Sequence, residues 1–186
     1  MQFLICLVIA FTLSEAALLF SKRSKTGTVK NRNDKRSLLL LWIIVPVCLI
    51  TGNIISRYHI WQFNDPAITM TAGIVIAIAG FFIRWIAIMQ LGKLFTVDVA
   101  ISTTHTLKTS GLYKIVRHPS YLGLIMIVAG FALCLNNGLS LLIILIPVFL
   151  AVNYRIRIEE RVLTNEFGDQ YIHYKNHVAR IIPGIY

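Results

Sequence analysis

Charged residues are scarce in this sequence. Asp, Glu, Lys and Arg make up 14% of its 186 residues, whereas hydrophobic residues make up 56%. Soluble domains carry roughly a quarter charged residues, and the few charges here gather in short segments. This composition excludes an ordinary soluble domain and indicates a membrane protein.

Cysteine is scarce too. Cys6, Cys48 and Cys134 lie in separate apolar runs, without the spacing of metal ligands, so we expect no metal. A P-loop and a glycine-rich dinucleotide-binding turn are also lacking. The net charge of +10 comes with no recognisable nucleic-acid-binding motif, and positive charge beside apolar spans is typical of membrane topology. We therefore expect no nucleic-acid partner.

Five apolar runs are present. The first lacks preceding basic residues and a clear cleavage site, which favours a retained helix over a signal peptide. The turn signal Asn136-Asn137-Gly138 divides the last apolar block into a short antiparallel hairpin, 119–152,. The sequence thus predicts an all-α, multi-pass integral membrane protein with about five transmembrane helices. The runs cover residues 1–20, 38–55, 67–91, 119–135 and 138–152.

Basic residues indicate the topology. Of the 18 Lys and Arg residues, all but Arg57 and Arg84 lie in three segments, 22–36, 92–117 and 153–186. With five spans these segments fall on one side, which the positive-inside rule places in the cytoplasm. The N-terminus is then expected outside or in a lumen.

Two ionisable residues, Glu15 and Arg84, lie within spans. Such groups usually pair or face a polar cavity. Arg84 is close enough to the inner end of its span to extend to the cytoplasmic surface. Whether it does so or faces a polar site inside the bundle is left open by the sequence.

Polar and aromatic residues gather on either side of the hairpin. Pro119 suits the first turn of a helix, so Arg117 and His118 directly precede a helix N-terminus, which can hold a carboxylate. After the hairpin, Arg155 and Glu159 are four residues apart and share a helix face. Taken alone, these groups fit interfacial anchors and a surface ion pair. Because both flank the same hairpin, they predict one site that joins a polar ligand to a lipidic one.

These motifs, in this order, resemble the isoprenylcysteine carboxyl methyltransferase family. The similarity covers about residues 84–183, and the N-terminal spans contribute little to it. The region between Phe95 and His105 departs from the family in being short and apolar. The motifs are Thr104-His105-Thr106-Leu107, Thr109-Ser110-Gly111-Leu112-Tyr113, Arg117-His118-Pro119-Ser120-Tyr121, Glu159-Glu160, Phe167-Gly168, Tyr171 and Tyr174.

The resemblance implies methyl transfer from S-adenosylmethionine to the C-terminal carboxylate of a prenylated cysteine. It implies that Arg155 is the catalytic, substrate-binding residue that meets this carboxylate. Residues 1–91 then form three transmembrane helices with a basic cytoplasmic loop, and residues 92–186 form the catalytic region. Its cytoplasmic cofactor site comprises the segment before the fourth predicted helix, 119–135, and the C-terminal tail. The implied cofactor contacts are His105, Thr106, Leu107, Lys108, Tyr113, His118, Pro119, Ser120, Tyr121, Glu159 and Glu160.

An α-carboxyl group is already ionised at neutral pH, so its methylation needs alignment and exclusion of water rather than a general base. The expected acceptor is a prenyl-type lipophilic substrate that enters from the membrane lipids. Phospholipid amine N-methylation and thiol S-methylation remain alternatives; in the amine case His105 or His118 would serve as the base. The non-enzyme alternative is a membrane scaffold or transporter subunit, although no inverted repeat is evident.

Overall fold

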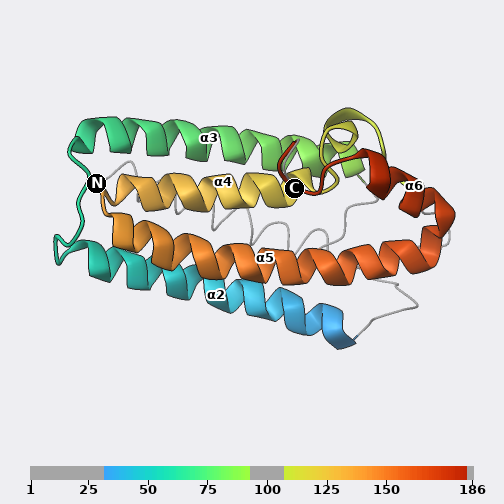
Figure 1. The fold of residues 1–186 in the computed structure, drawn as a ribbon, viewed down its shortest axis with the longest axis horizontal. Helices are drawn as coiled ribbons and strands as arrows, with labels where there is room; N and C mark the ends of the chain where they lie inside the picture. Colours follow the sequence, from blue (N-terminus) through green and yellow to red (C-terminus); the bar gives the residue numbers. More distant parts are fainter. Residues whose placement is uncertain (1–31, 93–106, 184–186) are drawn as a thin grey trace.

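The computed structural model describes residues 32–92 and 107–183. These residues fold into helices, with isolated backbone bridges in place of strands, and confirm the all-α prediction (Figure 1). The first predicted span, residues 1–20, lies outside the described residues. The elements are α2 (Arg32–Ser56), α3 (Pro66–Leu91), the 3-10 helix η2 (Gly111–Lys114), α4 (Pro119–Cys134), α5 (Gly138–Phe167) and α6 (Asp169–His177).

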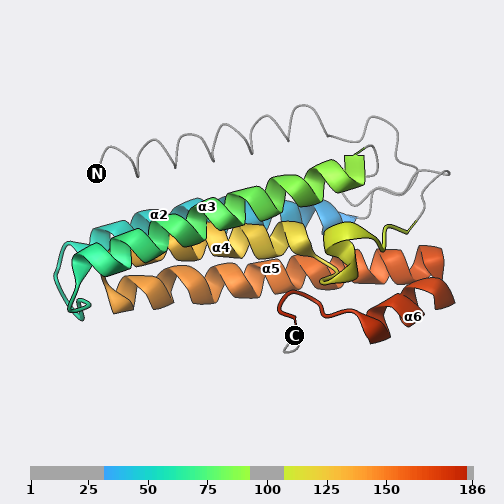
Figure 2. The same cartoon turned by 90° about the horizontal axis from the view of Figure 1, so that it is seen from above.

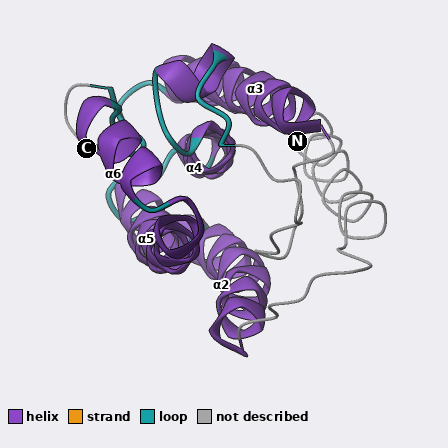
Figure 3. Cartoon of the chain, turned by 90° about the vertical axis from the view of Figure 1, so that its right-hand side faces the viewer, coloured by secondary structure: helices purple, strands orange, loops and turns teal. Residues whose placement is uncertain are grey.

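Helices α2 to α5 form an elongated antiparallel bundle. Helix α3 packs on α4, α4 on α5, and α5 on α2 (Figures 1 and 3). Three of them, α2, α3 and α5, are long and apolar enough to cross a membrane. Helix α4 has 16 residues, about 24 Å at 1.5 Å per residue, and is therefore shorter than a hydrocarbon core of about 30 Å.

The outer surface of α2 is apolar. Leu39, Ile43, Val47, Ile50 and Ile54 are exposed on this helix, and their spacing of three or four residues places them on one face. Leu41 and Cys48, on the opposite face, belong to the buried core. A face of this kind is stable against lipid and costly against water, as expected of an integral membrane protein.

Glycine allows α3 and α4 to approach closely. A Cβ atom on Gly80 would lie 2.7 Å from the carbonyl oxygen of Gly123, and one on Gly73 would lie 2.5 Å from that of Gly130. Backbone contact of this kind drives helix association in lipid, where burial of apolar side chains contributes little. The approach fixes α4, whose first turn carries the predicted motif, against α3.

Asn137 closes the bundle at the α4–α5 turn. Its Oδ1 accepts a hydrogen bond from the Ser140 backbone N–H at 2.8 Å, and its Nδ2 donates to the carbonyl of Ile60. The Ser140 hydroxyl donates to the carbonyl of Gly52 in α2 at 2.8 Å. The turn that the sequence predicted is therefore confirmed, and it also joins α2 to α5.

Helix α5 does not end at the predicted boundary, Val152, but continues to Phe167. Its 30 residues span about 45 Å, more than a hydrocarbon core of about 30 Å. The predicted boundary is therefore a change from apolar to polar composition within one helix. The chain then reverses at Gly168, whose φ is 50°, into α6.

The starts of α2 and α4 and the ends of α3 and α5 lie together, and η2 and α6 lie at the same end (Figure 2). The described parts of the three basic segments therefore share one end of the bundle. This is the arrangement that the charge distribution predicted.

Candidate active site

Arg155 is buried inside the bundle. Its exposed fraction is 2%, and its Nη1 donates to the Ser37 hydroxyl of α2 at 2.8 Å. Its Nε donates to the Tyr121 hydroxyl of α4 at 3.3 Å. Three helices thus orient the guanidinium, which was predicted to bind the acceptor. Ser37 was missed from sequence because only the packing of α2 on α5 brings it to Arg155.

Arg84 reaches the first turn of α4. Its Nη1 donates to both the carbonyl and the hydroxyl oxygen of Ser120, each at 3.0 Å, and the residue is buried. Of the two interpretations left open by the sequence, the structure favours the one in which Arg84 faces the polar site. It thereby fixes Ser120, one of the predicted cofactor contacts.

His118 is the N-terminal cap of α4, and Pro119 occupies the first helical position. The backbone N–H groups of Tyr121 and Leu122 both donate to the His118 carbonyl at 3.1 Å. The imidazole is buried, with its Nε2 3.3 Å from Glu160 Oε1 and its Nδ1 4.0 Å from Glu159 Oε1. Because an ionised carboxylate only accepts hydrogen bonds, the contact with Glu160 requires a proton on Nε2.

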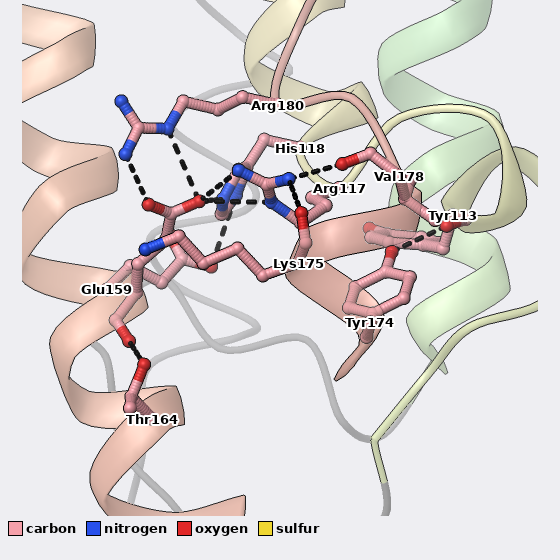
Figure 4. A network of polar contacts seen from close by, with 10 residues as sticks. Tyr113, Arg117, His118, Glu159, Thr164, Tyr174, Lys175, Val178 and Arg180 are labelled. Carbon is pink, nitrogen blue, oxygen red and sulfur yellow. Dashed lines mark hydrogen bonds and ion pairs between the residues drawn. The ribbon is translucent and has the colours of Figure 1, made fainter. Parts of the chain in front are cut away.

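Three basic side chains converge on Glu160. Arg117 donates from Nε and Nη2 to Oε1 at 3.1 and 3.0 Å, and Arg180 donates from Nη2 to Oε2 at 2.5 Å and from Nε to Oε1 at 3.3 Å (Figure 4). With the His118 contact, these residues form what we call the Glu160 cluster: Arg117, His118, Glu160 and Arg180. Sequence reasoning missed Arg180.

Glu159 differs from its neighbour in exposure. Its side chain is 28% exposed, against 6% for that of Glu160. The adjacent carboxylates therefore have different surroundings: Glu160 is enclosed by cations, and Glu159 remains accessible beside His118.

Tyrosines fix η2 to the helices around it. The Tyr174 hydroxyl donates to the Tyr113 carbonyl at 2.5 Å, and the Tyr113 hydroxyl donates to the Ala87 carbonyl at 3.3 Å. Burial raises the pKa of Tyr174 to about 12, so this side chain stays neutral and keeps its donor proton at physiological pH. Burial also raises the pKa of Tyr113.

The hydroxyl of Tyr171 in α6 has no hydrogen-bond partner among the described residues, although its residue is 1% exposed. Burial raises the pKa of this hydroxyl, and the negative charges of Glu160 and Glu159 add to the effect. A buried hydroxyl without a partner costs about 1–3 kcal/mol.

The structure brings most of the predicted site residues to one end of the bundle: Tyr113, His118, Pro119, Ser120, Tyr121, Arg155, Glu159 and Glu160. Leu107 and Lys108 are partly buried and precede η2. His105, Thr106 and the atypical region after Phe95 lie outside the described residues.

Known proteins resemble the part of the chain that carries this site. The model of the isoprenylcysteine carboxyl methyltransferase (ICMT) family matches residues 73–165. The protein-S-isoprenylcysteine O-methyltransferase of Saccharomyces cerevisiae is 34% identical over 141 residues, which are 74% of this chain and 59% of that protein. Protein-S-isoprenylcysteine O-methyltransferase A of Arabidopsis thaliana is 32% identical over 148 residues, which are 78% of this chain and 70% of that protein.

A solved structure of the eukaryotic intramembrane Ras methyltransferase ICMT aligns with a TM-score of 0.65 and 30% identity, over 77% of this chain and 52% of that one. The chain thus spans little more than half of that structure and 59% of the yeast relative. The matched residues include most of α3, all of α4 and most of α5, the helices that carry Arg84, His118, Arg155 and the glutamate pair. The resemblance read from the motifs is confirmed: the chain belongs to the isoprenylcysteine carboxyl methyltransferase family.

Proposed function

We propose that this protein transfers a methyl group from S-adenosylmethionine to the C-terminal carboxylate of a prenylated cysteine. The observation that carries the proposal is the buried guanidinium of Arg155, oriented by Ser37 and Tyr121 at the end of the bundle that also holds His118 and Glu159. A planar, oriented guanidinium in a dry site suits a carboxylate. The relatives named protein-S-isoprenylcysteine O-methyltransferase support this choice of acceptor.

The residues fit the methyl donor. S-adenosylmethionine supplies an electrophilic methyl group and presents an ammonium group and ribose hydroxyls. The accessible carboxylate of Glu159 can accept from such donors,. The cofactor contacts that we propose are those implied by the motifs, namely His105, Thr106, Leu107, Lys108, Tyr113, His118, Pro119, Ser120, Tyr121 and Glu159; Glu160 is considered separately below.

The protein's part in the reaction is alignment. The acceptor carboxylate is ionised at neutral pH, so no residue has to remove a proton. Arg155 holds one carboxylate oxygen and leaves the other free to attack, because a clamp on both would weaken the nucleophile. The surrounding apolar helices exclude water and receive the prenyl chain from the bilayer. Such positioning can supply several kcal/mol of the barrier, up to about 7–11.

In the proposed topology the site faces the cytoplasm and the N-terminus lies outside or in a lumen. Its support is the gathering of basic segments at the end of the bundle that carries the site, which the positive-inside rule assigns to the cytoplasm. A cytoplasmic site also meets a soluble methyl donor and a lipid-anchored acceptor at the same surface.

A radiolabelled methyl-transfer assay on a panel of acceptors tests the proposal. We expect transfer to a prenylcysteine and none to phosphatidylethanolamine or a small thiol. The rate should stay flat from about pH 6 to 8, because no acceptor proton has to leave. Transfer to the amine or thiol, with a rate that rises with pH, would replace this function by N- or S-methylation.

A further inference from the structure

We propose that Arg180 is a positioning residue of the methyl-donor site. Through Glu160 it fixes the C-terminal segment, which we define as residues 178–181, against the backbone that carries His118, and Glu160 itself binds no ligand. The inference rests on the proposed function, since it assigns a role within the same site. It assigns Glu159 to the methyl donor and Glu160 to the structure of the site.

The carboxylate of Glu160 already accepts hydrogen bonds from several side chains. Its Oε1 lies within 3.0–3.3 Å of nitrogen atoms from Arg117, His118 and Arg180, and its Oε2 lies 2.5 Å from a nitrogen of Arg180. Four donor nitrogens thus lie on Oε1 and one on Oε2, and the side chain is only 6% exposed. A ligand ammonium or hydroxyl would therefore have to compete with two guanidinium groups for a buried carboxylate.

The backbone of the C-terminal segment pairs with the residues before α4. The N–H of Arg117 donates to the Ala179 carbonyl at 2.8 Å, and the N–H of His118 donates to the carbonyl of Arg180 at 3.2 Å. Val116 and Ala179 form a parallel bridge. The segment therefore pairs with the residues that lead into α4, and Arg180 contacts His118 directly through its own carbonyl.

Side chains strengthen this pairing on both sides. The Arg117 Nη1 donates to the Lys175 carbonyl at 2.8 Å and to the Val178 carbonyl (Figure 4), and Ile181 is buried in the hydrophobic core. The segment is thus anchored before and after Arg180, while the Arg180 side chain reaches back to α5. Loss of that side chain would leave these anchors in place and remove the link between the segment and Glu160, so that Glu160 would be free to shift between its remaining partners.

A shift of Glu160 would also move His118. The His118 imidazole lies between the two glutamates, with Nε2 near Glu160 and Nδ1 near Glu159. A displacement of the His118 backbone or of Glu160 would therefore turn the ring relative to Glu159, the accessible carboxylate. Site geometry is sensitive to such changes, since a misplacement of 1 Å costs about 100-fold in rate.

Arg180→Gln in the full-length chain is the informative variant. Glu160 keeps Arg117 and His118 as partners in it, so no buried charge is left alone, whereas removal of Glu160 would leave two arginines uncompensated. We expect the Kd for S-adenosylhomocysteine, measured by calorimetry, and the KM for the methyl donor to rise roughly ten-fold or more. The KM for the prenylcysteine acceptor, which meets Arg155, should change less than about two-fold on this basis.

Two further variants complete the experiment. Arg180→Lys keeps a charge for Glu160 but loses the planar fork, so part of the affinity should return. Arg161→Gln is the matched control, because Arg161 follows Glu160 on the same helix and is exposed; donor affinity should equal that of the wild type. The Lys variant also serves if Arg180→Gln fails to fold, and its donor Kd should then exceed the wild-type value.

The direction in which Arg180→Gln changes the affinity for the methyl donor shows whether Glu160 binds that donor or only supports the site. If Glu160 bound the donor itself, loss of Arg180 would free Oε2 and leave donor affinity unchanged or tighter. That result would overturn the inference, as would a lowered Tm with an unchanged donor Kd, which is the mark of a purely structural residue. Failure of the wild-type protein to bind S-adenosylhomocysteine would instead refute the proposed function.

Discussion

At the scale of single residues, burial separates side chains that look alike in the sequence. Arg155 is enclosed within three helices and contacts Ser37 and Tyr121, whereas Arg157 and Arg161 on the same helix are exposed. Ion pairs of exposed arginines contribute little to stability. A buried guanidinium with oriented donors is suited to a specific anion, so Arg155 is the residue whose substitution is most informative for catalysis.

Arg155→Lys keeps the positive charge and loses the planar fork. Loss of one charge-assisted hydrogen bond in a dry site costs about 1.5–3 kcal/mol, or about one to two decades in rate. We therefore expect methyl transfer to prenylcysteine to fall about 10- to 100-fold, with the Kd for S-adenosylhomocysteine nearly unchanged. Single-turnover kinetics together with calorimetry would measure both quantities.

Ser37→Ala is the matched variant, since it removes one hydroxyl that orients Arg155 and leaves the guanidinium present. Its effect should have the same direction and be smaller. Near-normal turnover in Arg155→Lys, or loss of donor binding in place of turnover, would contradict the assigned role.

Several of these contacts are beyond sequence reasoning. The motifs named His118, Arg155 and the glutamate pair because each lies in a recognisable short pattern. Ser37 lies at the start of an apolar run, and Arg180 lies in the tail, where sequence alone gives it no partner. Their roles arise from contacts between distant segments, Ser37 with Arg155 and Arg180 with Glu160. Only the packing of α2 on α5 and the return of the chain through α6 reveal them.

At the scale of elements, composition predicted the helices better than their ends. The apolar runs located α3, α4 and the end of α2 to within one residue, because an apolar run marks the part of a helix that lies in lipid,. Helix α2 begins at Arg32, six residues before the predicted start. For α5 the same rule marked the boundary at Val152, although the helix continues to Phe167. Hydropathy marks the point at which a helix leaves the lipid. The backbone hydrogen bonds of the helix can continue beyond that point into water, so the helix is longer than its apolar run. The extension is functionally important, since it carries Arg155, Glu159 and Glu160.

The contact of α3 with α4 gives a prediction about stability. A Cβ on Gly80 would lie 2.7 Å from the Gly123 carbonyl oxygen and 2.8 Å from the Ile127 backbone nitrogen, and neither backbone atom can yield easily. Overpacking of this kind typically costs about 1–3 kcal/mol. We expect Gly80→Ala to lower the thermal unfolding temperature in detergent.

Val75→Ile on the exposed face of α3 adds one carbon, as Gly80→Ala does, but adds it at a side chain that is 59% exposed and away from the described helices. Its unfolding temperature should match that of the wild type. Equal unfolding temperatures for Gly80→Ala and the wild type would show that the helices approach less closely than the glycine contact requires. Because α4 begins with His118 and Pro119, a separation of α3 from α4 would also be expected to weaken donor binding.

At the scale of the whole molecule, charge and chemistry are concentrated at the same end. The ends of α3 and α5, the starts of α2 and α4, and helix α6 together carry the site (Figure 2). Arg57 lies in the loop between α2 and α3, at the opposite end of the bundle. The orientation that we propose from the positive-inside rule applies to the site as well as to the helices, so a test of topology is also a test of the proposed site.

Cysteine labelling in sealed vesicles of known orientation measures that topology. The native Cys6, Cys48 and Cys134 are first replaced by alanine, and single cysteines are introduced at Lys108, which precedes η2, and at Arg57. We expect a membrane-impermeant maleimide to reach position 108 from the cytoplasmic side alone and position 57 from the other side alone. Position 175 on α6, exposed in the structure, should behave as position 108 does, because both belong to the end of the bundle that carries the site.

Labelling of position 108 from outside would separate the site from the cytoplasmic methyl donor. It would leave the fold intact and remove the proposed reaction, since a donor made in the cytoplasm and the Arg155 site would then lie on opposite sides of the membrane.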